Sequence, residues 1–121
     1  MWNQRVSGGP FPFSEPENQA LKRLIEEQRP NRILTYHSDA RSVFAPHNKF
    51  GGGLEPKSLW LAQFYNGYSR YAAIYEWLHY PVTGDLSAWA TQELLIPSVT
   101  VELSDGTDQD RNFPAMDAVM R

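Results

Sequence analysis

The alternation of helix-like and strand-like segments constrains the fold of this chain more than any other feature. Apolar residues recur at helical spacing in some segments, whereas short apolar runs typical of strands lie between them. This pattern predicts helices over residues 14–29, 55–68 and 112–120, and strands over residues 32–37, 42–45 and 98–103. A further helix, capped by Asp85, is expected to carry Trp89 and Leu94. Tyr71–Trp77 fits either a strand or a loop. The sequence therefore predicts an α/β fold with a mostly parallel sheet flanked by helices.

The length of 121 residues fits one domain, and 41% hydrophobic content argues against disorder. No internal repeat or linker divides the chain. Residues 1–13 contain two glycines and two prolines without periodicity and are interpreted as an irregular arm. We therefore expect residues 1–121 to form a single unit.

Composition excludes several classes of function. The chain has no cysteine, so disulfides, thiolate metal sites and cysteine nucleophiles are excluded. The formal net charge is −3 and no basic stripe is visible, which argues against a nucleic-acid partner. No apolar run approaches the ~20 residues needed to span a membrane. Residues 1–9 lack the apolar segment of a signal peptide, and the compartment stays unknown.

The first predicted helix has a recognisable start. Ser14 precedes Glu17 by three positions, which is the spacing of a capping box, and Pro16 suits the first turn. Pro30 is expected to end this helix.

Ser98–Leu103 is the clearest strand in the chain. Valine and leucine alternate with Ser98, Thr100 and Glu102, so the polar side chains share one face. Two interpretations of Glu102 are open. It belongs either to the solvated face of an edge strand or to a functional site, since α/β sheets place their sites at the carboxyl ends of strands.

His37 also ends a predicted strand. A neutral imidazole there is either a structural side chain or a zinc ligand. Neither HxxE nor HxxxH occurs in the chain, so no local metal motif accompanies it. Ser38 and Asp39 follow directly, but neighbouring residues on a strand point apart and cannot form a catalytic triad with His37.

Aromatic residues offer further candidates. Tyr80 lies in an expected loop, where it either donates a hydrogen bond to a substrate or packs. A second group either forms a sugar-stacking surface or belongs to the core, as aromatic side chains bury large areas. This group consists of Tyr65, Tyr68, Tyr71, Tyr75 and Trp77.

Four stretches in order resemble the C-terminal part of the catalytic domain of the zinc carboxypeptidases, the carboxypeptidase A-like metallopeptidases. They span Ser14 to Leu103, and the "SEPE" opening is most similar to bacterial members. The stretches are Ser14–Leu21, Ile33–Ser38, Tyr80–Trp89 and Val99–Leu103. The resemblance implies a partial form of that family's mixed sheet.

The resemblance also implies roles for individual residues. His37 would be the third ligand of a catalytic Zn²⁺, and Glu102 would be the general base that activates water. Tyr80 would close over the substrate, and Ser38 would line the peptide subsites. The implied activity is zinc-dependent hydrolysis of a peptide bond, with a peptide or a peptidoglycan peptide as substrate.

The chain departs from the family pattern in several places, among them Asp39, which follows the His-Ser pair. The HxxE that supplies the first two zinc ligands is missing, and so is the Asn-Arg pair that holds the substrate carboxylate. Ser87 and Ala88 offer no charge to the specificity pocket. We therefore expect a truncated domain that is inactive alone. A cut of this kind would also expose a sheet edge, which favours self-association.

Two other functions remain open. One is a non-catalytic module that binds glycan or peptide through aromatic residues, or a degenerate remnant of an enzyme. The other is a zinc deacylase that acts on small N-acyl amino acids. The deacylase predicts a basic group near Glu102 to bind the acid, and the sequence shows none. The binding module predicts a response to free sugars.

Overall fold

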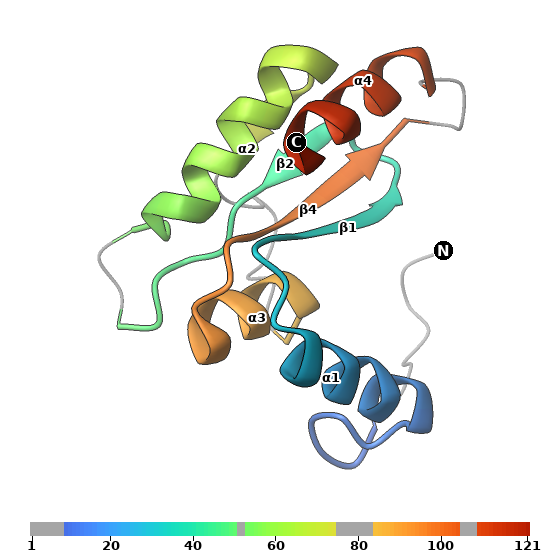
Figure 1. Cartoon of the computed structure of the whole chain (residues 1–121), viewed down its shortest axis with the longest axis vertical. Helices are drawn as coiled ribbons and strands as arrows, with labels where there is room; N and C mark the ends of the chain where they lie inside the picture. Colours follow the sequence, from blue (N-terminus) through green and yellow to red (C-terminus); the bar gives the residue numbers. More distant parts are fainter. Residues whose placement is uncertain (1–8, 51–52, 75–83, 105–108) are drawn as a thin grey trace, which may run out of the picture. The chain divides into compact units, whose positions relative to one another are not determined.

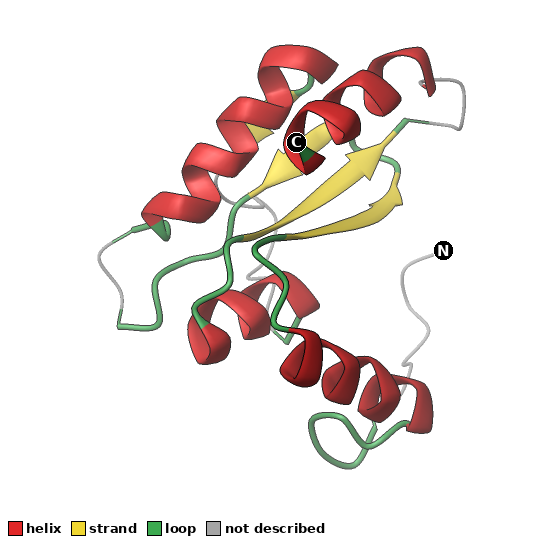
Figure 2. Cartoon of the chain, viewed as in Figure 1, coloured by secondary structure: helices red, strands yellow, loops and turns green. Residues whose placement is uncertain are grey.

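The computed structural model describes residues 9–50, 53–74, 84–104 and 109–121 (Figure 1). The chain divides into two compact units, Met1–Pro30 and Asn31–Arg121, and each is described by itself. The first unit carries helix α1. The second carries the sheet and the other helices (Figure 2).

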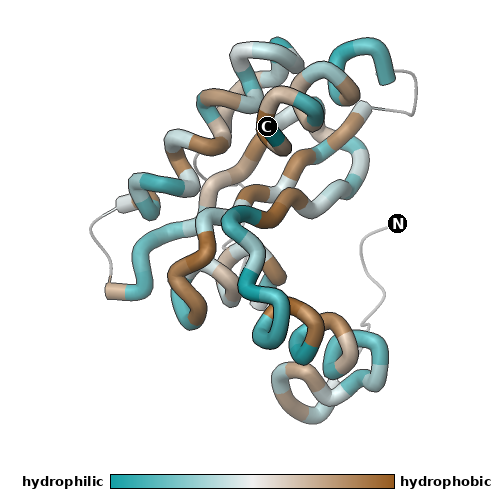
Figure 3. Tube along the Cα trace, in the orientation of Figure 1, coloured by the Kyte–Doolittle hydropathy of each residue, from teal (hydrophilic) through white to brown (hydrophobic). Residues whose placement is uncertain are grey.

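Helix α1 covers Pro16–Gln28, close to the predicted range. Its N-cap is Glu15, without a side-chain cap, so the predicted capping box is wrong. The Ser14 hydroxyl instead donates to the Glu15 carboxylate at 2.8 Å. Ile25 is the buried residue of the helix, and Figure 3 shows hydrophilic colour over most of its turns. Arg29 adopts the left-handed conformation and ends the helix just before Pro30.

The second unit is built on a four-stranded sheet in the order β1-β4-β2-β3. β1 pairs with β4 in parallel, β2 pairs with β3 in parallel, and β2 pairs with β4 antiparallel. The α/β prediction is confirmed, with a mixed sheet. The strands are β1 (Ile33–Ser38), β2 (Ser42–Phe44), β3 (Ala72–Ile74) and β4 (Ser98–Leu103).

β4 lies between β1 and β2, so its interpretation as an edge strand is wrong (Figure 1). Residues 39–41 connect β1 to β2 and therefore pass across the carboxyl end of β4. Neighbouring strands lie about 4.8 Å apart, so this connection spans roughly 10 Å. That distance is within reach of a short extended segment.

Three helices accompany the sheet: α2 (Pro56–Ser69), α3 (Leu86–Leu94) and α4 (Gln109–Met120). α3 begins as predicted, because the Asp85 side chain accepts a hydrogen bond from the Ala88 N–H at 2.9 Å. α4 begins at Gln109, earlier than the predicted Asn112. None of the helices among the described residues is long and apolar enough to cross a membrane.

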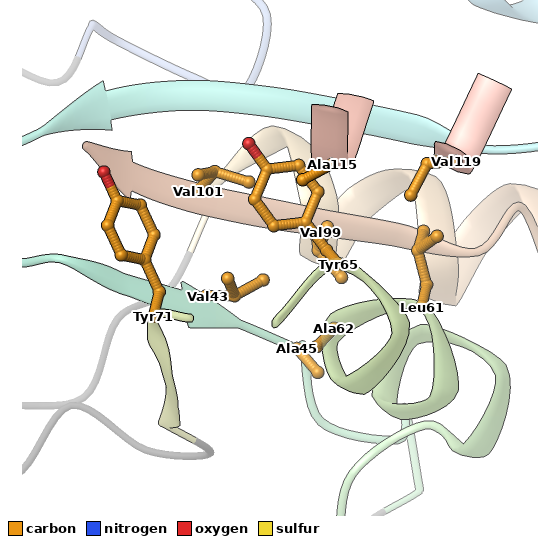
Figure 4. Close-up of a cluster of buried hydrophobic side chains, with 10 residues drawn as sticks. All are labelled: Val43, Ala45, Leu61, Ala62, Tyr65, Tyr71, Val99, Val101, Ala115 and Val119. Carbon is orange, nitrogen blue, oxygen red and sulfur yellow. The ribbon is translucent and has the colours of Figure 1, made fainter. Parts of the chain in front are cut away.

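α2 and α4 cover one face of the sheet and enclose the core (Figure 4). The fully buried side chains include Val43, Leu61, Tyr65, Val99, Val101 and Val119. The Tyr65 hydroxyl donates to Asn112 Oδ1 at 2.7 Å, and Asn112 Nδ2 donates to the Tyr71 hydroxyl at 2.9 Å. This chain of hydrogen bonds satisfies the polar atoms that the aromatic side chains bring into the core.

The core interpretation of the aromatic residues is confirmed for Tyr65 and Tyr71, which are buried. Tyr68 is half exposed on α2. Tyr75 and Trp77 lie outside the described residues.

Candidate functional site

Two strands place His37 and Glu102 side by side. His37 on β1 is the parallel register partner of Glu102 on β4, and Ser42 on β2 is the antiparallel partner of Glu102. Register partners in a sheet project their side chains from the same face. The imidazole, the carboxylate and the serine hydroxyl therefore form one row across neighbouring strands. We refer to these three residues as the polar row.

Hydrogen bonds of the residues two positions before His37 and Glu102 identify the face of the sheet that carries the polar row. Thr35 Oγ1 donates to Thr100 Oγ1 at 2.9 Å, so these residues share a face with His37 and Glu102. Ser87 on α3 lies 3.1 Å from the same Thr100 oxygen. α3 thus covers the amino-terminal part of this face. His37 is exposed and Glu102 half-buried, so the carboxyl end of this face is open to solvent.

The alternation of residues in β4 determines this orientation. Val99 and Val101 are fully buried on the face covered by α2 and α4. Burial of these two side chains removes apolar surface from water and directs Thr100 and Glu102 to the opposite face. A slip of one residue in register would expose the valines and bury the carboxylate. The core thus determines where the carboxylate lies.

The other two predicted site residues are Ser38 and Tyr80. Ser38 ends β1 opposite Leu103, one position beyond the polar row, and is exposed. Because successive residues of a strand alternate, its register position belongs to the other face. The Ser38–Asp39 peptide bond is cis. Tyr80 lies outside the described residues.

A hollow of about 250 Å³ lies at the segment that crosses the end of β4. Asp39, Ala40, Arg41 and Ser104 line it. The Ser104 hydroxyl is buried and has no hydrogen-bond partner among the described residues, which is uncommon in a folded protein. Among the described residues, Arg41 is the cation nearest in sequence to the polar row, since it directly precedes Ser42.

Sequence reasoning missed Arg41, Ser42 and Ser104 as site residues. One feature of the sequence could have pointed to Arg41 and Ser42, namely the short segment between His37 and the second predicted strand. It indicated that the start of that strand returns close to the end of the first. It could not show that β4 lies between them.

Over the part of the chain that the structure describes, no group of three or more His, Cys, Asp and Glu side chains could hold a metal ion. A catalytic zinc site takes three protein ligands. The polar row supplies one imidazole and one carboxylate, so the described residues do not make a complete zinc site. His37 is suited by chemistry and exposure to be one ligand of such a site.

Tyr36 and Tyr65 approach each other on the face of the sheet covered by α2 and α4, with their hydroxyl oxygens 3.5 Å apart. Burial raises the pKa of the Tyr65 phenol well above its ordinary value, and the nearby Tyr36 hydroxyl adds to the shift. Burial also raises the pKa of Tyr36, partly offset by its hydrogen bond with Tyr65. Both phenols therefore stay neutral at physiological pH.

The sequence matches the zinc carboxypeptidase family over residues 3–118, which is almost the whole chain. The chain belongs to this family. The resemblance inferred from the four sequence stretches is confirmed. Zinc carboxypeptidases are in general zinc-dependent hydrolases, and this membership indicates a hydrolase of the same type. A comparison with curated proteins gave no significant match.

A solved structure supports the fold of this zinc carboxypeptidase chain. Murein-tripeptide amidase MpaA from Escherichia coli O157 superposes with a TM-score of 0.63 at 19% sequence identity. The superposition covers 93% of this chain and 44% of the MpaA chain. This chain therefore spans less than half the length of that relative. At this identity the likeness concerns the fold alone.

Proposed function

We propose that this chain contributes the general base and one metal ligand to the hydrolysis of a peptide or amide bond. The observation that carries the proposal is the register of β1 and β4, which pairs His37 with Glu102. Membership of the zinc carboxypeptidase family supports the same reaction class. The substrate class is a peptide, and a peptidoglycan peptide is favoured by the likeness to a murein-tripeptide amidase.

Two features of Glu102 support its proposed role as the general base. Its carboxylate is half-buried on an internal strand, so the backbone holds it while one side remains open to water. In the proposed reaction, Glu102 accepts a proton from the attacking water and returns it to the leaving amine. A bound zinc ion would polarise the carbonyl oxygen and lower the pKa of water.

His37 is the proposed metal ligand on this chain. Its exposed imidazole lies at the open end of the polar row. The other ligands are proposed to come from outside this chain, since it carries no HxxE motif. Ser38 and Tyr80 are proposed to contact the substrate.

Zinc titration of the 121-residue chain tests the ligand assignment without an activity assay. A single imidazole should bind Zn²⁺ only weakly, and His37→Ala should remove that binding. His47→Ala is the control, because His47 lies outside the polar row and should not affect it. Tight stoichiometric binding by the unaltered chain would overturn the inference that the other ligands lie elsewhere.

Peptide hydrolysis by a protein that carries this sequence together with a complete zinc site tests the base. Glu102→Gln should lower kcat by about 10²–10⁴-fold and leave the zinc content unchanged. Glu27→Gln makes the same chemical change on the exposed part of α1 and should leave kcat unchanged. If Glu102→Gln retains full turnover, Glu102 is not the base.

One observation favours a second candidate, a deacylase that acts on small N-acyl amino acids. Arg41 directly precedes Ser42 and lines, with Asp39, the hollow at the segment that crosses the end of β4, where its guanidinium would bind a free carboxylate. A deacylase predicts that Arg41→Gln raises KM for N-acyl amino acids by about tenfold or more. A peptidase predicts a preference for peptides over N-acyl amino acids, and Arg41→Gln would then change KM little.

A further inference from the structure

A second pocket lies away from the polar row, at the start of α2. Its volume is about 410 Å³, within the range of small-molecule sites. It lies between the amino end of α2 and the residues that lead into β1 and β4. The lining residues are Asn31, Arg32, Pro56, Lys57, Trp60, Leu61 and Pro97.

Positive charge and apolar surface meet in this pocket. Among the described residues that line it, Arg32 and Lys57 carry charge and none is acidic, although the chain as a whole has a net charge of −3. Among the described residues, Lys57 takes part in none of the ion pairs. The pocket therefore has unneutralised positive charge.

Arg32 and Trp60 are both held in place. The Arg32 Nη1 atom donates to the Val119 carbonyl, which anchors the guanidinium at the last turn of α4. The Trp60 indole stacks on the Phe64 ring, with centroids 5.1 Å apart and an interplanar angle of 22°. Yet 57% of the Trp60 side chain is exposed. An ordered indole with an open face offers a flat apolar surface without an ordering cost on binding.

We propose that this pocket binds a small carboxylate that carries a flat apolar body. The carboxylate would lie between the Lys57 ammonium and the Arg32 guanidinium, since arginine and lysine are the natural partners of carboxylates. The apolar body would lie against Trp60, Pro56 and Pro97. Neither the family membership nor the polar row assigns a function to these residues, so this site is independent of the proposed hydrolysis.

Three ligands, titrated into the 121-residue chain, test separately the need for the carboxylate and the need for the flat apolar body. 3-Phenylpropionate carries both the charge and the flat apolar body, 3-phenylpropionamide lacks the charge, and propionate lacks the ring. Calorimetric titration should give the lowest Kd for 3-phenylpropionate, by about fivefold or more over each of the others. Equal affinity for the amide or for propionate would overturn the proposal.

Matched variants locate the binding. Lys57→Gln and Trp60→Ala should each raise the Kd of 3-phenylpropionate by about fivefold or more. Lys22→Gln on α1 and Phe50→Ala, which removes a ring that is 94% exposed, are the controls and should leave the Kd unchanged. Glu102→Gln should also bind normally, which distinguishes this pocket from the polar row.

Folding and contact are checked with the same proteins. Urea unfolding should show that Lys57→Gln is as stable as the unaltered chain, because the residue is exposed. In a ¹H–¹⁵N spectrum the Trp60 indole signal, assigned with Trp60→Phe, should shift on addition of 3-phenylpropionate. If Lys57→Gln folds and binds as the unaltered chain does, or the indole signal does not move, the proposal is wrong.

Discussion

The two faces of the central sheet carry different kinds of residue. On the face covered by α2 and α4, the strands present valines to a dry core in which each tyrosine hydroxyl has a partner. On the other face, the same strands present threonine, serine, histidine and glutamate, partly covered by α3. One face thus holds the fold together and thereby positions the residues of the other. Variants on the two faces should therefore affect different measurements.

The largest expected effect on stability comes from the core face. Leu61 is only 2% exposed, and Leu61→Ala should lower the free energy of unfolding by about 3 kcal/mol through lost burial and a cavity. Urea denaturation measures this change. Leu95→Ala removes a leucine that is 79% exposed and should cost less than about 0.5 kcal/mol. Similar costs for the two variants would contradict the assignment of the core.

The buried hydrogen bond is expected to be next in size. Tyr65→Phe leaves Asn112 Oδ1 without its donor, and should cost roughly 1–3 kcal/mol in urea denaturation. Tyr68→Phe removes a hydroxyl from a half-exposed ring on the same helix and serves as the control. If both variants lose the same stability, the hydrogen bond between Tyr65 and Asn112 does not contribute more to stability than an exposed hydroxyl does.

Alkaline pH should lower the stability of the folded protein through Tyr65 on the core face. The folded protein holds the pKa of Tyr65 above the ordinary value of 10.0, so the unfolded chain loses this proton first as pH rises. Its contribution to stability is present below pH 10 and is lost progressively above it. The urea midpoint should therefore fall more steeply above pH 10 in the unaltered chain than in Tyr65→Phe. Parallel profiles would show that Tyr65 is not responsible.

The smallest effect on stability is expected on the polar row. Glu102→Gln preserves the shape of a half-buried side chain and should change the free energy of unfolding by less than about 0.5 kcal/mol. Urea denaturation checks this value. A loss of more than about 2 kcal/mol would show that Glu102 has a structural role, and the contrast between the two faces would disappear.

Local signals predicted much of the fold. Asp85 marked the start of α3, and strict alternation marked β4, because capping and strand periodicity depend on a few adjacent residues. The predicted cap of α1 was wrong, because the Ser14 hydroxyl donates to the Glu15 carboxylate and Ser14 does not cap a helix N–H. Local patterns therefore predicted which segments form helices and strands more accurately than they predicted which atoms cap the helices.

The neighbours of each strand could not be predicted from local signals. β4 was considered as an edge strand, and its place between β1 and β2 depends on residues far apart in the sequence. His37 and Glu102 were predicted as site residues individually, through the family resemblance. Their pairing and the position of Ser42 beside Glu102 depend on the sheet register. The hollow lined by Arg41 depends on the fold of residues 39–41 against Ser104.

The segment 39–41 has a consequence for how the chain reaches its native state. β1 and β2 run in opposite directions and are joined by a connection short enough for a hairpin, yet β4 separates them. The nascent chain produces β1 and β2 long before β4. A local hairpin between them would have to open before the central strand could insert. The sheet therefore cannot form until strands far apart in the sequence have paired. A high contact order of this kind makes folding slow.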